Sequence, residues 1–321
     1  MTNIYKDAKV FIAGAAGLVG QALVRALVPL GAKITATEFK NRKIDAQYRD
    51  EIRILLNWDL TDPRYIADSY KEQEIVFWCA AKVGGAKAIR ENASEMIHYN
   101  LEMSSRNIRA AAEAGVKRFC YLSSSYTYPD LGRPNVEGDT DIGDVPMIHY
   151  GLGWIKRYIE TLLRHYHMTT QMKAAIVRPA AIYGTHDDFD LETCHAVPAL
   201  VRKVAERQNP LEVWGDGNEE RQYTFADDLA EGLLTVTENF AVAVPINIST
   251  TQVSSVADVW RTLCDIAGLN CLVKYLADKP QVIQSRLVDV SLAKRLLGIE
   301  CKTDLRTGLE KTLEWYKANH K

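Results

Sequence analysis

The sequence lacks the features that mark membrane, secreted and nucleic-acid-binding proteins. No apolar run reaches the roughly 20 residues needed to span a bilayer. At the N-terminus no long apolar core precedes a small-residue cleavage site, so we expect no signal peptide. The net charge is only −2, whereas nucleic-acid-binding domains usually carry a basic surface. We therefore expect a cytoplasmic protein that binds neither membranes nor nucleic acid.

Cysteine, glycine and proline are also too sparse for a disulfide framework or a low-complexity chain. The six cysteines show no CxxC pair, so we expect reduced thiols. His165-Tyr166-His167 and Cys194-His195 are too isolated to form a metal site. Apolar residues make up 47% and charged residues 25% of the 321 positions, which is typical of a globular protein with one large or two small domains.

The opening stretch predicts a dinucleotide-binding turn. A buried strand, AKVFIA, leads into GAAGLVG, then into a helical pattern and a second strand that ends at Glu38. Gly14 permits the tight turn, Gly17 lets the backbone approach a pyrophosphate, and Gly20 lets the helix pack on the strand. The N-terminus of the helix offers unpaired N–H groups to the phosphates. The alternative is a glycine turn that serves packing alone.

Glu38 bears on the choice between NAD and NADP. It lies eighteen residues after Gly20, where an acidic side chain accepts hydrogen bonds from the adenosine ribose. It would repel a 2′-phosphate, so we expect NAD. The basic run at 40–43 keeps NADP as the alternative, unless that run is only a solvated loop.

Strand and helix patterns alternate up to about residue 185. Alternation of this kind predicts an α/β fold with a doubly wound parallel (Rossmann) sheet, followed by a smaller discontinuous C-terminal α/β substrate lobe. We assign 1–177 and 224–249 to the first lobe, and 178–223 and 250–321 to the second. Helices are expected at 93–115, 154–168, 196–207, 226–238, 254–267 and 305–319.

These motifs resemble those of the extended short-chain dehydrogenase/reductase superfamily. The glycine pattern GxxGxxG matches its cofactor turn, and Asp59-Leu60 matches the acidic position after its third strand. Within the superfamily the GDP-L-fucose synthase group is the most similar, and the segments that resemble it in order include CAAKVGG, SSSYTYP, RPAAIYG, HDDF, HAVPALVRK, WGDG, RQYTFADDLA and SRLVDVSLAKRLLG. The resemblance covers nearly the whole chain and implies an enzyme that acts on a nucleotide sugar, in particular a GDP-sugar.

The resemblance also implies a catalytic set. In the superfamily a tyrosine moves a proton at the sugar oxygen, a lysine holds the nicotinamide ribose, and a serine hydrogen-bonds the reacting oxygen. The candidates here are Ser124, Tyr150 and Lys156. His195 is a candidate proton donor or sugar-binding group.

The spacing of Tyr150 and Lys156 departs from the superfamily, because they are six residues apart rather than four. On a regular helix six residues turn by about 240°. In one interpretation, which is our prediction, Gly151 and Gly153 let Tyr150 lie before the helix and still reach the site. In the other, Trp154 replaces the lysine and the site is altered or inactive.

A second departure is Tyr126, which occupies the position of a cysteine that epimerises the sugar together with a histidine in GDP-L-fucose synthases. Near neutral pH a smaller fraction of a phenol than of a thiol is ionised and able to act as a base, because their unperturbed pKa values are about 10 and about 8.5. We therefore do not expect double epimerisation by that route.

Binding residues follow from the same resemblance. NAD is expected to contact Gly14, Gly17, Leu18, Val19, Gly20, Glu38, Asp59, Leu60, Ala80, Ala81, Lys82 and Lys156. The nucleotide sugar is expected to contact Val83, Gly84, Gly85, Ser125, Tyr126, Val197, Leu200, Lys203, Trp214, Arg221 and Arg286. The two arginines are expected on the diphosphate, which guanidinium binds through parallel donors. The apolar helices at 93–115 and 154–168 often form a dimer interface in this family, so we expect a homodimer.

Three functions of different class stay open. The first is an NAD(P)-dependent oxidoreductase that oxidises a hydroxyl or reduces a keto group of a nucleotide sugar. The second is a nucleotide-sugar epimerase that uses bound NAD as a transient hydride store. The third is a non-catalytic NAD-binding member of the family.

Overall fold

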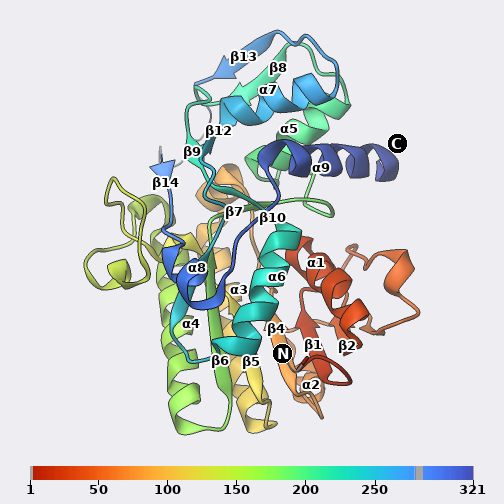
Figure 1. Cartoon of the computed structure of the whole chain (residues 1–321), viewed down its shortest axis with the longest axis vertical. Helices are drawn as coiled ribbons and strands as arrows, with labels where there is room; N and C mark the ends of the chain where they lie inside the picture. Colours follow the sequence, from red (N-terminus) through yellow and green to blue (C-terminus); the bar gives the residue numbers. More distant parts are fainter. Residues whose placement is uncertain (1–2, 278, 280–284, 321) are drawn as a thin grey trace.

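A seven-stranded parallel sheet forms the larger lobe of the computed structural model, which describes residues 3–277, 279 and 285–320 (Figure 1). Its strand order is β11-β6-β5-β4-β1-β2-β3, with every neighbouring pair parallel. This order confirms the predicted α/β fold with a Rossmann-type sheet. The strands are β1 (Lys9–Ala13), β2 (Lys33–Thr37), β3 (Arg53–Leu55), β4 (Ile75–Trp78), β5 (Arg118–Leu122), β6 (Lys173–Pro179) and β11 (Pro245–Ile248).

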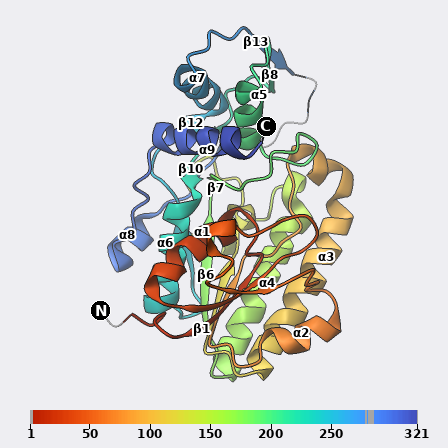
Figure 2. The ribbon, with the colours of Figure 1, turned by 90° about the vertical axis from the view of Figure 1, so that its right-hand side faces the viewer.

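Helices cover both faces of this sheet (Figure 2). Successive residues of a strand point to opposite faces, so Val10 and Ile12 of β1 join one apolar cluster while Phe11 and Ala13 join another. The first cluster packs against α1 (Leu18–Leu27), α6 (Ala226–Asn239) and α8 (Ser291–Leu297). The second packs against α2 (Pro63–Ser69), α3 (Ala86–Glu113) and α4 (Tyr150–Thr169).

The smaller lobe surrounds a third apolar cluster above the sheet. It contains α5 (Ala196–Ala205), α7 (Val256–Ile266) and α9 (Leu305–Asn319). Its short strands pair as β7 (Ala181–Tyr183) with β10 (Tyr223–Phe225), and β8 (Leu211–Trp214) with β13 (Val273–Leu276). In a third sheet, β9 (Glu220–Arg221) lies between β12 (Ser254–Ser255) and β14 (Ser285–Arg286).

The lobes differ in one respect from the predicted division, which placed all of 250–321 in the smaller lobe. Ala293 of α8 is buried in the same apolar cluster as Leu229 and Leu233 of α6. The chain therefore returns to the larger lobe at α8 before α9 ends it in the smaller one. The reason is that the apolar side chains of Leu292, Ala293 and Leu297 on α8 pack on this cluster.

Two helices begin earlier than expected, and both changes affect the site. α3 begins at Ala86 and bends at Asn92, whose backbone angles are not helical. α4 begins at Tyr150 rather than at residue 154. In the part of the chain that the structure describes, no helix is long and apolar enough to cross a membrane.

Candidate active site

The glycine turn lies where β1 meets α1, and its backbone leaves room for a phosphate group. Gly14 has a φ of +77°, and a Cβ there would lie 2.8 Å from the backbone nitrogen of Ala80. A Cβ on Gly20 would lie 2.2 Å from the Gly14 carbonyl oxygen. At Gly17 a Cβ would meet only that same oxygen, at 3.3 Å, so the missing side chain leaves a cradle at the start of α1. These features fit a dinucleotide pyrophosphate.

The other predicted cofactor residues of this edge are grouped around the turn. Leu18 and Val19 begin the first turn of α1, and Ala80 and Ala81 follow β4 after a single intervening residue. Asp59 accepts hydrogen bonds from the amide (2.9 Å) and hydroxyl (2.7 Å) of Thr61, and the Leu60 side chain is buried. The Lys82 backbone is fixed on both sides by the Asn100 side chain, and its ammonium group pairs with Glu95.

Glu38, which follows β2, is more enclosed than expected. Its side chain is only 1% exposed, and its carboxylate accepts a 2.8 Å hydrogen bond from the Ile44 amide and pairs with Arg49 and Lys43. Burial raises the pKa of Glu38, but the hydrogen bonds from Arg49 and Ile44 outweigh it and the pKa lies below its ordinary value. A ribose hydroxyl would therefore share this carboxylate with protein donors.

Two cations near the cofactor edge already have acidic partners. Arg42 lies 3.4 Å from Asp188, and Lys43 lies 3.4 Å from Glu38. The basic run at 40–43 is thus partly neutralised, which favours NAD over a cofactor with an additional phosphate.

Lys156 lies half-buried at the carboxyl end of β5. Its Nζ donates a 2.9 Å hydrogen bond to the Leu122 carbonyl and lies 4.8 Å from the centre of the Tyr121 ring. Burial lowers its pKa to about 8, although Glu160 acts in the opposite direction. Ser124 lies two residues beyond Leu122, so the structure brings Ser124 and Lys156 to the same edge of the sheet.

Four residues of α4 and of the turn before it face the segment 122–126, which contains Ser124. His149 stacks on Tyr126, Gly153 packs against the Tyr126 carbonyl, Lys156 binds the Leu122 carbonyl, and Glu160 accepts a hydrogen bond from Ser123. Their spacing of four, three and four residues is that of one helix face.

Tyr150 does not lie on this face, and the prediction that it lies before the helix is wrong. It has right-handed helical backbone angles (φ −46°, ψ −62°) and is the first residue of α4. Its side chain is 41% exposed and its ring meets the edge of Trp154, whose indole nitrogen donates to Asp144. A helical Tyr150 lies about 240° around α4 from Lys156, so it points away from the lysine.

Tyr126 does lie beside the α4 face. It belongs to a short 3-10 helix, η3 (Ser125–Thr127), and its amide donates a 3.1 Å hydrogen bond to the Ser124 hydroxyl. A Cβ on Gly153 would lie 2.3 Å from the Tyr126 carbonyl oxygen, so only glycine permits this approach. Ring centroids of Tyr126 and His149 are 4.2 Å apart at 14°, and the Arg286 guanidinium carbon lies 4.5 Å from the Tyr126 ring centre.

Arg286 and Arg221 lie next to each other on parallel strands β14 and β9. Burial lowers the pKa of both guanidinium groups, that of Arg286 to about 10, and the Arg221 charge contributes to the shift of Arg286. Two partly desolvated like charges side by side favour an anion between them. The structure therefore places the two predicted diphosphate residues together.

His149 is a site residue that the sequence analysis missed. It is 2% exposed, and neither ring nitrogen has a hydrogen-bond partner among the described residues. Burial lowers its pKa to about 3, with further contributions from the Arg286 and Arg221 charges. Counting back from Lys156 in helical steps of three and four leads to Gly153 and then to His149, so the spacing held a signal for it.

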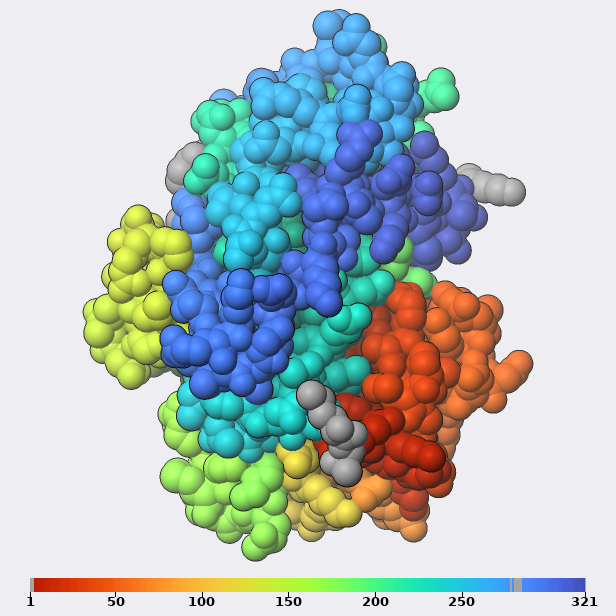
Figure 3. All heavy atoms as spheres, in the orientation of Figure 1, coloured from red at the N-terminus to blue at the C-terminus, as the bar shows by residue number. Residues whose placement is uncertain are grey.

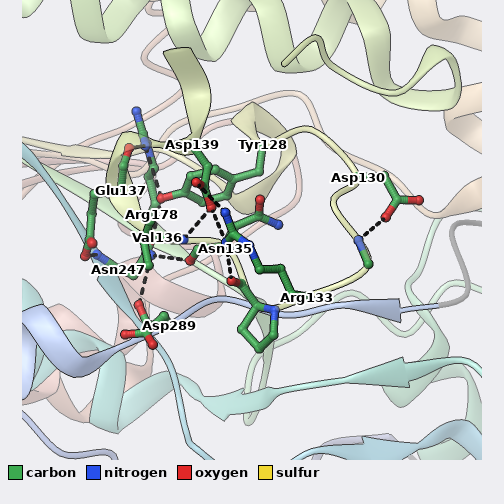
Figure 4. A network of polar contacts seen from close by, with 12 residues as sticks. Tyr128, Asp130, Arg133, Asn135, Val136, Glu137, Asp139, Arg178, Asn247 and Asp289 are labelled. Carbon is green, nitrogen blue, oxygen red and sulfur yellow. Dashed lines mark hydrogen bonds and ion pairs between the residues drawn. The ribbon is translucent and has the colours of Figure 1, made fainter. Parts of the chain in front are cut away.

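A buried polar network fixes the segments that carry this cluster (Figure 4). Arg178 pairs with Glu160 and donates to the Tyr128 hydroxyl (3.0 Å), which in turn donates to Asn247 (2.6 Å). The side-chain amide of Asn247 donates hydrogen bonds to the backbone carbonyls of Asn135 and Asp289, at 3.1 and 3.0 Å. In Figure 3 the segment around α8 accordingly lies against residues 130–145. The network holds β14, and with it Arg286, beside the Tyr126 turn.

The predicted sugar-facing glycines pack against the segment that precedes α5. A Cβ on Gly85 would lie 2.2 Å from the Cys194 carbonyl, and the Gly85 amide donates to the Thr193 carbonyl at 2.8 Å. This contact brings Val83 and Gly84 near His195. The His195 side chain reaches solvent. Partial desolvation nevertheless lowers the pKa of His195.

Most of the remaining residues expected to contact the substrate are buried or bound to other parts of the protein. Val197 and Leu200 are buried in the third apolar cluster. The Lys203 ammonium group donates to the Glu212 carbonyl at 2.7 Å, and Ser125 is buried in η3. Trp214 ends β8, and Lys279 lies 5.9 Å from its ring centre. Among the described residues no group of histidine, cysteine and acidic side chains is arranged for a metal ion.

The parallel sheet and the glycine turn together define a dinucleotide-binding α/β protein. The sequence profile of the NAD dependent epimerase/dehydratase family matches residues 10–249. The chain belongs to this family and is an NAD-dependent enzyme, as its motifs predicted.

Known relatives span almost the whole chain. GDP-L-fucose synthase of Escherichia coli (strain K12) is 28% identical over 327 residues, which cover 97% of each protein. GDP-mannose 3,5-epimerase of Arabidopsis thaliana is 29% identical and covers 97% of this chain and 83% of its own. An epimerase from Methanothermobacter thermautotrophicus has the same fold, with a TM-score of 0.89 at 23% identity over 99% of this chain and 94% of its own.

Proposed function

We propose that the protein is an NAD-dependent oxidoreductase that interconverts a hydroxyl and a keto group on a GDP-sugar. The observation that carries this proposal is the half-buried Lys156, which donates a hydrogen bond to the Leu122 carbonyl at the carboxyl end of β5. Two residues further along the chain, Ser124 begins the turn that we assign to the substrate. The hydrogen bond from Lys156 to Leu122 uses one of three ammonium donors, which leaves two for the hydroxyls of a nicotinamide ribose.

Each group of the chain has a distinct task in this proposal. Bound NAD supplies the site that accepts or returns a hydride. The Gly17 cradle and the start of α1 bind its pyrophosphate, and Lys156 holds its ribose. Ser124 hydrogen-bonds the reacting sugar oxygen, and Arg221 and Arg286 hold the diphosphate of the substrate. The guanine preference rests on the relatives that act on GDP-sugars.

A thermal-shift screen with NAD present tests the substrate class, because ligands that bind only the folded state raise its apparent stability. GDP should raise the melting temperature more than UDP or TDP. Equal shifts from all three would remove the guanine preference and leave the diphosphate site intact. Reduction of NAD by a GDP-sugar, followed at 340 nm, then tests the reaction.

One observation favours the non-catalytic alternative. The positions one helical turn before Lys156 are Leu152 and Gly153, neither of which can transfer a proton. Tight NAD binding without turnover of any nucleotide sugar would support that alternative. An epimerase would instead retain NAD and change the sugar without net consumption of added cofactor.

We also propose that two copies associate through α3 and α4. Tyr150, Trp154 and Tyr158 recur every four residues on α4 and are 41%, 43% and 52% exposed. Such an exposed apolar stripe fits a protein interface. Light scattering should show a dimer that Trp154→Lys converts to a monomer, whereas a Lys317→Gln control should leave the mass unchanged.

A further inference from the structure

The α4 face lacks the expected phenol, but the Tyr126 ring lies beside the start of this helix, where it stacks on His149. Tyr150 is exposed on the opposite face, and Leu152 and Gly153 occupy the turn before Lys156. The backbone carbonyl of Tyr126 packs against Gly153, and its amide donates a hydrogen bond to the Ser124 hydroxyl. Because the Tyr126 ring also lies beside the Arg286 guanidinium group, this tyrosine contacts both Ser124 and the arginine pair.

We infer that Tyr126 is the proton-transferring phenol of the site, and that His149 positions its ring. This inference rests on the proposed function and names the residue that performs its acid–base step. It assigns a catalytic role to the η3 turn instead of to α4.

The environment of Tyr126 suits this role. His149 covers one part of its ring at 4.2 Å, and the Arg286 guanidinium carbon lies 4.5 Å from the ring centre. When the phenol oxygen carries a negative charge, the neighbouring guanidinium attracts it. The ring is half-buried, so both neighbours restrict its orientation while part of it stays accessible.

The step balances with the groups already named. In the oxidative direction the Tyr126 phenolate would take the proton of the sugar hydroxyl, and NAD⁺, when bound, would supply the acceptor for the hydride of the same carbon. The products would be the keto sugar, NADH and a neutral Tyr126, whose proton would then pass to solvent. In the reductive direction the same phenol returns the proton to the oxygen.

His149 acts in this inference through its shape. Both of its nitrogens lack partners among the described residues, and it is held neutral by burial and by the two arginine charges. A neutral flat ring supports Tyr126 by stacking. Phenylalanine should therefore replace it, whereas alanine should not.

The test compares Tyr126→Phe with the matched control Tyr150→Phe. Tyr126→Phe should lower kcat about 10²–10⁴-fold, the usual contribution of a positioned acid or base, while Tyr150→Phe stays near wild type. Calorimetry supplies a readout independent of turnover. Tyr126→Phe should weaken binding of GDP-mannose and GDP-L-fucose about 3–10-fold, as expected for one hydrogen bond, and leave binding of GDP and of NAD unchanged.

The outcomes separate this inference from the proposed function. A wild-type protein that binds neither GDP-sugar contradicts the proposed function. A wild-type protein that binds them without turnover, or a Tyr126→Phe variant with wild-type kcat, overturns the role of Tyr126. The same conclusion follows when Tyr126→Phe weakens GDP and GDP-sugars equally, since the hydroxyl then does not contact the sugar.

The positioning role of His149 has its own test. His149→Ala should lower kcat about 10²-fold because a displacement near 1 Å has that effect, and His149→Phe should restore activity to within about threefold with the same pH profile. Loss of activity in both variants would show that the imidazole acts by its nitrogens, which contradicts the stacking role.

Discussion

Two clusters of charge flank α4, and they differ in which charges lie side by side: opposite charges in the first and like charges in the second. In the first, Arg178 pairs with Glu160 and binds Tyr128, and burial is more than offset by Glu160, so the pKa of Arg178 lies above its ordinary value. In the second, Arg286 lies beside Arg221, and His149 has two unpartnered nitrogens. The first arrangement stabilises the fold, whereas the second has a desolvation cost that a bound anion would offset.

The largest effect is expected when one charge of the first cluster, the Arg178–Glu160 pair, is removed. Arg178→Leu should lower the free energy of unfolding by about 3–5 kcal/mol, because it leaves the Glu160 carboxylate buried without its partner. Urea unfolding measures the change. In the control Lys294→Gln, which removes an exposed ion pair with Glu300, the change should stay within the error of the measurement. Equal effects of the two substitutions would mean that the Arg178 network is not structural.

Removing a charge of the second cluster should affect binding more than folding. Arg286→Gln should weaken GDP binding about 10–100-fold, the range for hydrogen bonds to a charged group. Its folding should be unharmed, since the repulsion from Arg221 is relieved. Calorimetry with GDP and urea unfolding provide the two numbers, and Arg306→Gln on the surface of α9 is the control. A large loss of stability with normal GDP affinity would place Arg286 in the first kind of cluster.

The sequence predicted the cofactor edge of the molecule better than the cluster around Tyr126. The cofactor edge is defined by the strand pattern and by Gly14, Gly17 and Gly20, because the local backbone at each of these positions requires a glycine. Tyr150 was assigned by a motif, yet a helix that begins four residues earlier turns it away from Lys156. Local sequence does not show which helix face meets the 122–126 segment, and that contact decides the roles of Tyr126 and His149.

At the cofactor edge, Glu38 resembles Glu160 of the first cluster, because its buried carboxylate is paired with cations. Glu38→Ala should release Arg49 and Lys43, which can then attract a 2′-phosphate. The ratio of NAD to NADP affinity should move toward NADP about 10-fold, as for one charge-assisted interaction. Calorimetry with both cofactors tests this, with Glu72→Ala at a distant ion pair as the control. Tighter binding of NADP than NAD by the wild type would contradict the ribose argument.

His149→Phe is the mildest change and should show directly what the two unpartnered His149 nitrogens cost the folded state. At pH 7 we expect the variant to be about 1 kcal/mol more stable, because two buried nitrogens without partners are replaced by carbon. The gap should widen as the pH falls. The folded-state pKa of His149 is about 3, below the ordinary value of 6.5, so below pH 6.5 the unfolded wild type binds a proton that the folded wild type does not. Wild-type stability should therefore fall by about 1 kcal/mol per pH unit relative to the variant between pH 6.5 and 3. Urea unfolding at pH 7.5, 6.5 and 5.5 measures the gap, and a gap that stays constant would mean that folded His149 takes up a proton and has a partner.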